Sequence, residues 1–558
     1  MKKLLLILVA MVVVGSCTNK KEVVDSKANS VETPFVWENA NIYFLLTDRF
    51  KNADTLNDIN FNRTKPTGKL RGFEGGDIKG IKQKIEEGYF NKLGINAIWF
   101  TPIVEQIHGA VDEGTGATYG YHGYWAKDWT ALDPNYGTKV DLKNLVELAH
   151  KNGIRILLDG VINHTGPVTD VDKVWSADWV RTAVQCDYQN YKNNITCTLV
   201  KNLPDIKTES NNFVELPKQL TDKWKEEGRY EQEMKELDAF FTRTGYPKAP
   251  RFYIIKWLTD YITEFGIDGY RADTVKHTEE FVWSEFKNEC DYAFNQWKKE
   301  NPTKVLDDNN FYLVGEVYNY GISGGQLFDF GDKKVNYFEN GFTSLINFEF
   351  KWNAAQQSYE ELFSKYSSIL NNELKGFSVL NYISSHDDGD PFDKERTKPF
   401  ESATKLLLCP GASQVYYGDE SARSLTIEGT EGDATLRSNM NWDKIKNDEK
   451  TQEILEHWQK LGTFRSKHPS IGAGVHKMIS ANPYVFKRTY MKGEFNDAVV
   501  VGLDLNEGEK ELNVSSVFKD GSVLNEAYSG NEVTVKDGIA NLNTPFPIVL
   551  LEIKNHKK

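Results

Sequence analysis

Eight short apolar segments alternate with longer amphipathic stretches between residues 42 and 417. Continuous apolar strands that alternate with helices are typical of a parallel sheet covered on both faces. Eight such units predict a closed (β/α)8 barrel, a TIM barrel, rather than an open sheet. The predicted strands are 42–46, 95–100, 154–158, 266–271, 311–314, 345–350, 377–383 and 413–417.

Two regions depart from this alternation. A polar, irregular stretch separates the third and fourth predicted strands, which predicts an inserted domain B over the active face of the barrel. Near the C-terminus, short alternating runs are separated by turn pairs such as Asp537-Gly538, the pattern of an antiparallel β-sandwich. The predicted boundaries are 37–163 and 251–472 for the barrel, 164–250 for domain B and 473–558 for the β-sandwich.

The N-terminus has the pattern of an export signal. A charged start is followed by an apolar run over 4–14, too short to span a bilayer, and then by small residues before Cys17. This resembles a bacterial lipobox and predicts a lipoprotein signal peptide over 1–17, with Cys17 lipidated and 18–36 as a flexible tether. The protein would face the periplasm or the cell surface, held to the membrane only by acyl chains. The alternative is a secreted protein in which Cys17 is incidental.

The net charge indicates which binding partners are improbable, and the cysteine content indicates which disulfide to expect. With 67 Lys and Arg against 80 Asp and Glu, the net charge of −13 argues against nucleic acid as a partner. We expect a monomer. Cys186 and Cys197 are the best candidates for a disulfide in an exported chain, whereas Cys290 and Cys409 are expected to be buried thiols.

Polar residues at the ends of the predicted strands are the candidates for catalysis, because all strands of a barrel point their C-terminal ends at one mouth. Asp159, Asp273, Glu316 and Asp387 each follow an apolar run. Arg271 lies two residues before Asp273, so both face the same way and the cation keeps the carboxylate ionised. Glu316, in partly desolvated surroundings near other carboxylates, is suited to donate a proton. Such a pair of carboxyl groups is the one that glycosidases use; the alternative is a structural ion-pair network at the rim of the barrel.

At these residues the chain resembles the α-amylase family of glycoside hydrolases, family thirteen. Four motifs carry the resemblance, in the order and spacing of the family, and two further segments are similar to its domain B signature and its sugar-stacking loop. The four motifs are Asp159–His164, Gly269–His277, Gly315–Val317 and Ser385–Asp387, and the further segments are Leu203–Ile206 and Tyr121–Trp125.

The resemblance implies roles for the three carboxyl groups. Asp273 would be the nucleophile, Glu316 the general acid/base, and Asp387 the carboxylate that stabilises the transition state, in a reaction that retains the anomeric configuration. Many members have Asn where this chain has Ser385, which leaves the rate and the linkage preference open.

It also implies a set of substrate-binding residues. Arg271, His164 and His386 would line the subsite of the attacked glucose, and Tyr124, in one loop with His122, would stack on that sugar. Lys276 and His277 resemble the pair that meets the leaving-group side in true α-amylases, which favours hydrolysis of α-1,4 bonds in starch or maltodextrin. The alternatives are a neopullulanase- or cyclomaltodextrinase-like enzyme, a transglycosylase, or a non-catalytic glucan-binding lipoprotein.

Calcium is the cofactor that the resemblance implies. Counterparts of Asn163, Asp205 and the backbone carbonyl of His277 hold an ion between barrel and domain B in α-amylases. A second cluster after the first strand repeats the spacing of another calcium loop of the family, although a solvated turn would account for it as well. Its members are Asn52, Asp54, Asn57, Asp58, Gly75 and Asp77.

Overall fold

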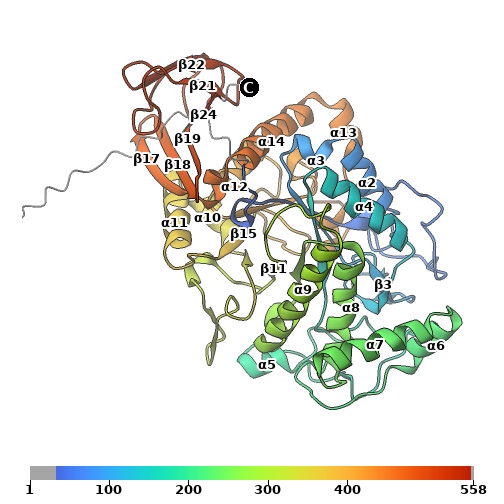
Figure 1. Ribbon diagram of the computed structural model, residues 1–558. Coiled ribbons are helices and arrows are strands. Elements are labelled where there is room, and N and C mark those ends of the chain that lie inside the picture. The colour runs from blue at the N-terminus through green and yellow to red at the C-terminus, as the bar shows by residue number, and fades with distance from the viewer. Residues whose placement is uncertain (1–32, 113, 555–558) are drawn as a thin grey trace, which may run out of the picture. The chain divides into compact units, whose positions relative to one another are not determined.

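In the computed structural model, which describes residues 33–112 and 114–554, eight parallel strands close into a barrel (Figure 1). The strand order is β1-β16-β15-β14-β11-β10-β7-β2, and β1 pairs with both β2 and β16, which closes the sheet. The predicted (β/α)8 barrel is therefore confirmed. The strands are β1 (Asn41–Leu45), β2 (Ala97–Phe100), β7 (Arg155–Gly160), β10 (Gly269–Ala272), β11 (Tyr312–Gly315), β14 (Ser344–Asn347), β15 (Ser378–Tyr382) and β16 (Ala412–Tyr416).

Two predicted strand boundaries differ from the structure by three residues, and the others agree within one or two. The fourth strand begins at Gly269, because Gly266 instead ends the preceding helix in a left-handed conformation with φ 72°. The sixth strand ends at Asn347, and Phe350 begins a helix. In both cases the apolar run continues from a strand into a neighbouring helix or cap, so composition alone did not mark the boundary.

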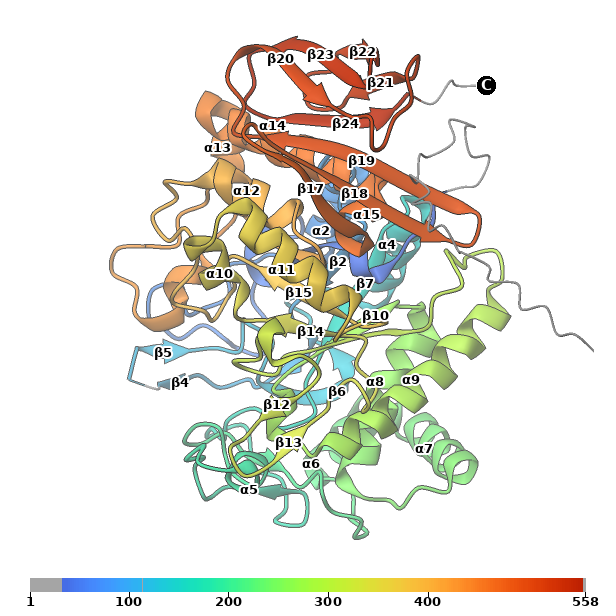
Figure 2. The ribbon, with the colours of Figure 1, turned by 90° about the vertical axis from the view of Figure 1, so that its left-hand side faces the viewer.

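Helices follow most of the barrel strands, and α8 and α9 run side by side (Figures 1 and 2). The exception is β11, which leads into the hairpin of β12 (Phe328–Asp329) and β13 (Lys334–Val335) before β14. The helices outside the inserted segment are α1 (Thr47–Phe50), α2 (Ile78–Glu86), α3 (Tyr89–Lys92), α4 (Lys139–Lys151), α8 (Pro250–Phe265), α9 (Glu280–Glu300), α10 (Phe350–Gln356), α11 (Tyr359–Asn371), α12 (Pro399–Leu407), α13 (Trp442–Asn447), α14 (Glu449–Lys467) and α15 (Pro469–Ala473).

Small elements fill the stretch between β7 and α8. Cys186 and Cys197 form a disulfide there, and the backbone N–H of Tyr191 donates to Asp332 of the β12–β13 hairpin at 2.8 Å. Figure 2 shows that hairpin next to this segment. The elements are β8 (Val180–Arg181), α5 (Tyr191–Ile195), β9 (Asp205–Ile206), α6 (Lys218–Glu226) and α7 (Tyr230–Thr244).

Two further hairpins arise from the chain after β2. In one, β3 (Val104–Gln106) pairs with β6 (Ala126–Leu132). In the other, β4 (Val111–Asp112) pairs with β5 (Ala117–Thr118). The segment between β3 and β6 contains His122 and Tyr124, so the β3–β6 pair fixes where that segment leaves and rejoins the barrel.

The C-terminal strands form a six-stranded sheet, in the order β17-β18-β19-β24-β21-β22, and a two-stranded sheet, β20-β23. Leu512 and Leu542 of the smaller sheet share a core with Val500 and Leu524 of the larger one, which is the packing of a β-sandwich. Residues 479–487 and 498–554 make up this compact unit. The strands are β17 (Val475–Ala481), β18 (Tyr484–Lys492), β19 (Phe495–Leu503), β20 (Gly508–Asn513), β21 (Val523–Glu526), β22 (Glu532–Thr534), β23 (Ile539–Thr544) and β24 (Val549–Ile553).

The predicted signal peptide with Cys17, and the predicted tether as far as residue 32, lie outside the described residues. Within 33–112 and 114–554, no helix is both long enough and apolar enough to cross a bilayer.

Candidate functional site

Strand register brings two of the predicted catalytic carboxyl groups to one level of the barrel. Arg271 of β10 lies opposite Asp159 of β7. Directly after the strands, the backbone N–H of Asp273 donates to Gly160 at 3.0 Å, and that of Glu316 donates to Ala272 at 3.0 Å. Asp273 and Glu316 therefore leave adjacent strands at the same height.

The guanidinium of Arg271 connects the acidic groups of the site. Its Nη1 lies 2.6 Å from Asp273 Oδ1 and 3.0 Å from Asp159 Oδ1, and its Nη2 lies 3.0 Å from Glu316 Oε1. The Arg271 side chain is only 2% exposed, so solvent screens these contacts little. One buried cation thus holds Asp273 and Glu316 in a fixed relation to each other.

Glu316 has the protonation behaviour of an acid catalyst. Burial, together with the nearby charges of Asp273 and Asp387, raises the pKa of Glu316 to about 8, although Arg271 opposes the shift. The backbone N–H of Thr274 donates to the other carboxyl oxygen at 2.8 Å. Thr274 itself has φ 49°, the kind of backbone strain that concentrates at functional sites. Because its pKa is raised to about 8, the Glu316 carboxyl is largely protonated at neutral pH.

Asp387 behaves in the opposite way. Burial would raise its pKa, but His386, the Ser385 hydroxyl and Arg271 together lower it. Ser385 Oγ donates to Asp387 Oδ1 at 2.7 Å. The side chain is 34% exposed, more than those of the other two carboxyl groups. Asp387 is thus an ionised carboxylate at the open side of the site, and Ser385 orients it.

Aromatic and imidazole rings line one wall. The ring of Tyr124 stacks on that of His386, with centroids 5.3 Å apart, and its hydroxyl donates to Asp159 Oδ2 at 2.9 Å. His122 lies on the same side, and its ring centroid is 5.8 Å from that of Tyr124. His164 Nε2 lies 3.1 Å from the Tyr124 carbonyl oxygen. The structure therefore brings these predicted substrate-binding residues together around the carboxyl groups.

The histidines of the wall are neutral at physiological pH. Burial lowers the pKa of His386 to about 4, and it also lowers the pKa values of His122 and His164. His386 Nδ1 is buried and has no hydrogen-bond partner among the described residues, and Asp387 Oδ1 lies 3.8 Å from it. An unpaired buried polar atom is costly, so this nitrogen is suited to meet a hydroxyl group of a bound sugar.

Trp99 was not among the predicted site residues, and Asp159 was predicted only as a candidate at the end of a strand, without a role. Asp159 accepts hydrogen bonds from Arg271, Tyr124 and Trp99, and burial raises its pKa to about 7. Its position at the end of a strand was a usable signal, whereas Trp99 lies within an apolar run that looks like core. The hollow beside the carboxyl groups is lined by Trp99, Arg271, Glu316, Ile346, Phe348, Tyr382, Ser385, His386, Asp387 and Gln414.

Lys276 and His277 lie in different surroundings. Lys276 Nζ lies 5.1 Å from the ring centroid of Tyr318 and 5.9 Å from that of Tyr188, two half-exposed rings. Burial lowers the pKa of Lys276, and the nearby Glu316 opposes the shift. His277 is buried, and its Nδ1 lies 2.9 Å from the carbonyl oxygen of Asn194. Lys276 thus lies near Glu316 between two aromatic rings, whereas His277 contacts the inserted segment.

The predicted calcium residues between barrel and inserted segment converge. Asn163 Nδ2 lies 2.9 Å from both Asp205 Oδ1 and the His277 carbonyl oxygen. An amide turned by half a revolution would present its oxygen to the same point, which gives three oxygen donors. Arg181 forms an ion pair with the second oxygen of Asp205 and would compete with a metal ion.

The residues of the second predicted calcium cluster fall into two groups, which differ in their hydrogen-bond partners. Within the described part of the chain, Asn52 Oδ1 and Asn57 Oδ1 are buried without a hydrogen-bond partner, and Asn52 Nδ2 donates to Asp58 at 2.9 Å. A Cβ on Gly75 would lie 2.3 Å from the Asn52 side chain, so only glycine lets the backbone come this close.

Asp54 and Asp77, by contrast, are engaged elsewhere. Asp77 accepts from the N–H groups of Ala53 and Gly80, and Asp54 pairs with Lys79. Among the described residues, no group of three or more His, Cys, Asp or Glu side chains could hold a metal ion. Any ion held by the described residues would therefore need amide and backbone oxygens in addition to carboxylates.

Comparisons with known proteins agree with this geometry. The family model "Alpha amylase, catalytic domain" matches residues 44–471. The periplasmic alpha-amylase of Escherichia coli K12 is 35% identical, covering 79% of this chain and 69% of its own length. The cyclomaltodextrin glucanotransferase of Geobacillus stearothermophilus is 27% identical, covering 83% of this chain but only 59% of its own length.

A solved structure supports the fold. The crystal structure of an Anoxybacillus alpha-amylase superposes with a TM-score of 0.62 at 24% identity, covering 94% of this chain and 100% of that one. With the barrel, the three converging carboxyl groups and the family match over most of the sequence, the chain belongs to the α-amylase family of glycoside hydrolases.

Proposed function

We propose that the protein hydrolyses internal α-1,4 bonds of starch or maltodextrin with retention of configuration. The protonated carboxyl of Glu316 would give its proton to the glycosidic oxygen while Asp273 attacks the anomeric carbon. This step breaks the glycosidic bond and forms a covalent glycosyl-enzyme. The Glu316 carboxylate would then take a proton from the water that releases the sugar.

The observation that carries this proposal is the shared contact of Asp273 and Glu316 with Arg271. It supports a pair of carboxyl groups that are held close together, and burial raises the pKa of one of them, Glu316, to about 8. Asp387, ionised and partly exposed, is suited to bind sugar hydroxyls and to stabilise positive charge on the ring.

Related activities are the second candidate, because the similar proteins include a cyclomaltodextrin glucanotransferase and a cyclomaltodextrinase. A time course of products from amylose, pullulan and cyclodextrins, with the anomer recorded, separates them. We expect α-anomeric maltooligosaccharides from amylose. Panose from pullulan, preferred ring opening or cyclic products would contradict hydrolysis of linear α-1,4 chains, and the β-anomer would contradict the retaining mechanism.

We also propose that the protein binds calcium. Calcium takes six to eight oxygen ligands, including amide and backbone carbonyl oxygens. The two unpaired amide oxygens of Asn52 and Asn57, beside Asp58 and the Gly75 backbone, fit this requirement. Asn163, Asp205 and the His277 carbonyl offer a second set of donors. Calcium there would hold loops together and would take no part in the chemical step.

Finally, we propose that the protein is exported and anchored by a lipid on Cys17. The support is the sequence of residues 1–17, together with the similarity to a protein named as periplasmic. The substrate would then be met outside the cytoplasm.

A further inference from the structure

Two buried carboxylates face each other in the hairpin that carries Tyr124. Glu105 of β3 pairs with Asp128 of β6 in the register of the strands, and the two residues are 2% and 1% exposed. Like charges directly opposite each other destabilise a strand pair, and buried charges need partners. The hairpin therefore requires cations from elsewhere in the chain.

The inserted segment supplies those cations. Lys223 of α6 places its ammonium 2.8 Å from Glu105 Oε2 and 2.6 Å from Asp128 Oδ2. Arg229 adds a contact of 2.9 Å to the same oxygen of Asp128. The two carboxylates raise the pKa of Lys223 although burial opposes this, so the ammonium stays charged. Lys223 is thus the one cation among these contacts that touches both strands.

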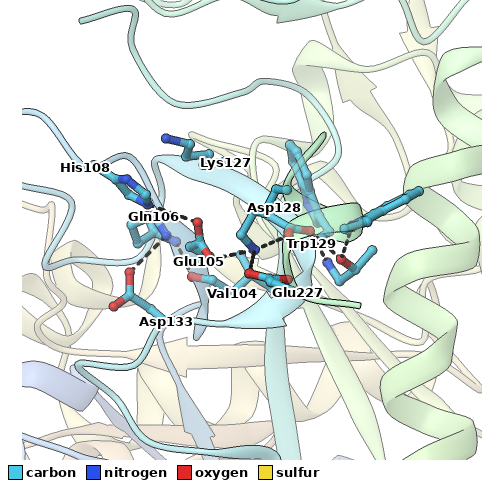
Figure 3. Close-up of polar contacts among 12 residues, drawn as sticks. Val104, Glu105, Gln106, His108, Lys127, Asp128, Trp129, Asp133 and Glu227 are labelled. Atoms are coloured by element: carbon cyan, nitrogen blue, oxygen red, sulfur yellow. Dashed lines mark hydrogen bonds and ion pairs between the residues drawn. The ribbon is translucent and has the colours of Figure 1, made fainter. Parts of the chain in front are cut away.

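Figure 3 shows the other groups around the two carboxylates. His108 Nε2 lies 3.0 Å from Glu105 Oε1, and Glu227 lies 3.2 Å from Lys223. Without Lys223, Asp128 would keep Arg229, whereas Glu105 would keep only a histidine that is charged only when protonated. Loss of the Lys223 ammonium should therefore destabilise the position of β3, which contains Glu105, more than that of β6.

The same hairpin fixes the position of Tyr124. Gln106, the neighbour of Glu105, accepts from the backbone N–H of Trp125 through Oε1 at 2.7 Å. The Ile107 N–H donates to the Trp125 carbonyl at 3.0 Å. Because Tyr124 directly precedes Trp125, a displacement of β3 moves the ring that faces the site.

We propose that Lys223 is a positioning residue: by neutralising Glu105 and Asp128 across the hairpin, the inserted segment sets the position of the Tyr124 ring over the sugar-binding site. This inference rests on the proposed function for the role of Tyr124, but the ion cluster itself does not depend on it. The inserted segment thereby takes part in substrate binding through a residue that does not touch substrate.

Two measurements on Lys223→Met test the inference. Hydrogen exchange should become faster at the amides of Ile107 and Trp125, and KM for maltooligosaccharide should rise about tenfold or more with a smaller change in kcat. The double variant Lys223→Met/Glu105→Gln removes the uncompensated charge and should restore both values. Lys218→Met is the matched control, since Lys218 lies on the same helix but pairs only with the exposed Asp222.

The outcomes distinguish the inference about Lys223 from the proposed hydrolysis of α-glucans. Unchanged exchange at Ile107 and Trp125 in Lys223→Met overturns the inference, as does a double variant that is no better than the single one. A variant that melts at lower temperature but keeps KM and exchange unchanged below its melting point shows a merely structural lysine and also overturns it. If the wild-type protein does not hydrolyse α-glucans, the proposed function fails, and the exchange data still decide the role of Lys223.

Discussion

At the scale of single residues, Arg271 does most to define the site. A buried guanidinium that touches Asp159, Asp273 and Glu316 neutralises part of a strongly acidic cluster and fixes its geometry. Removing such a cation would leave several buried carboxyl groups without a compensating charge, which is strongly destabilising. Substitutions of the carboxyl groups themselves are therefore the cleaner probes of catalysis.

Glu316→Gln and Asp273→Asn should each lower kcat by about two to four orders of magnitude, because each removes a group that reacts with substrate but keeps its size and one oxygen that can accept from Arg271. Steady-state kinetics on a soluble maltooligosaccharide measure the loss. Thermal melting by circular dichroism is the control for folding. Near-normal turnover in either variant would refute the assigned roles.

The pH dependence of activity should follow from the opposite pKa shifts of Glu316 and Asp387. Glu316 must be protonated to act as the acid, so kcat/KM should fall as the pH rises through about 8. Asp387 must be ionised, and its lowered pKa places the acidic limb at low pH. Ser385→Ala removes a hydrogen bond that lowers the pKa of Asp387 and should move the acidic limb upward. A profile that already falls between pH 5 and 7 would contradict the assignment of Glu316.

At the scale of elements, the loops after the strands decide what the barrel can do. The hairpin β12–β13 replaces a helix after β11 and binds the inserted segment through Tyr191 and Asp332. The loop after β1 contains two buried amide oxygens without partners, which is unfavourable unless a ligand satisfies them. Removal of a metal ion should therefore destabilise this loop.

Chelation of calcium should therefore lower the melting temperature by several degrees, because a ligand at a hundred times its Kd stabilises the folded state by about 2.7 kcal/mol. Differential scanning calorimetry with and without a chelator measures the shift, and added calcium should reverse it. In Asn52→Ala/Asn57→Ala the shift should be smaller. An identical melting temperature in chelator and in calcium would refute the proposal.

At the scale of the whole molecule, three parts with different patterns follow one another. The proposed N-terminal signal, the barrel with its inserted segment and the C-terminal sandwich can be predicted from the sequence because each has its own periodicity or composition. The sandwich has its own core, in which Val500, Leu512 and Leu524 come from both sheets. The proposed lipid anchor would depend on a single residue, Cys17.

Cys17→Ser should transfer the protein from the membrane fraction to the soluble exported fraction, because lipidation needs the cysteine thiol. Ser16→Ala, which keeps a small residue before the cysteine, serves as the control and should stay with the membrane. Immunoblots of the fractions measure the distribution. Wild-type protein in the soluble fraction would contradict a lipid anchor.

The sequence by itself determined the barrel and the identity of the three carboxyl groups. Apolar runs specify strands because they must be buried on both faces, and a residue directly after such a run lies at the mouth of the barrel whatever the rest of the chain does. Strand ends predicted Asp159, Asp273, Glu316 and Asp387 as candidates for this reason, and the resemblance to the family then gave the last three their expected roles.

Only the tertiary structure decided how these groups interact. The raised pKa of Glu316, the unpaired nitrogen of His386 and the contacts of Lys223 with Glu105 and Asp128 depend on distances between residues that are far apart in the chain. Burial and Coulomb energies change steeply over a few ångströms, and sequence spacing does not contain those distances.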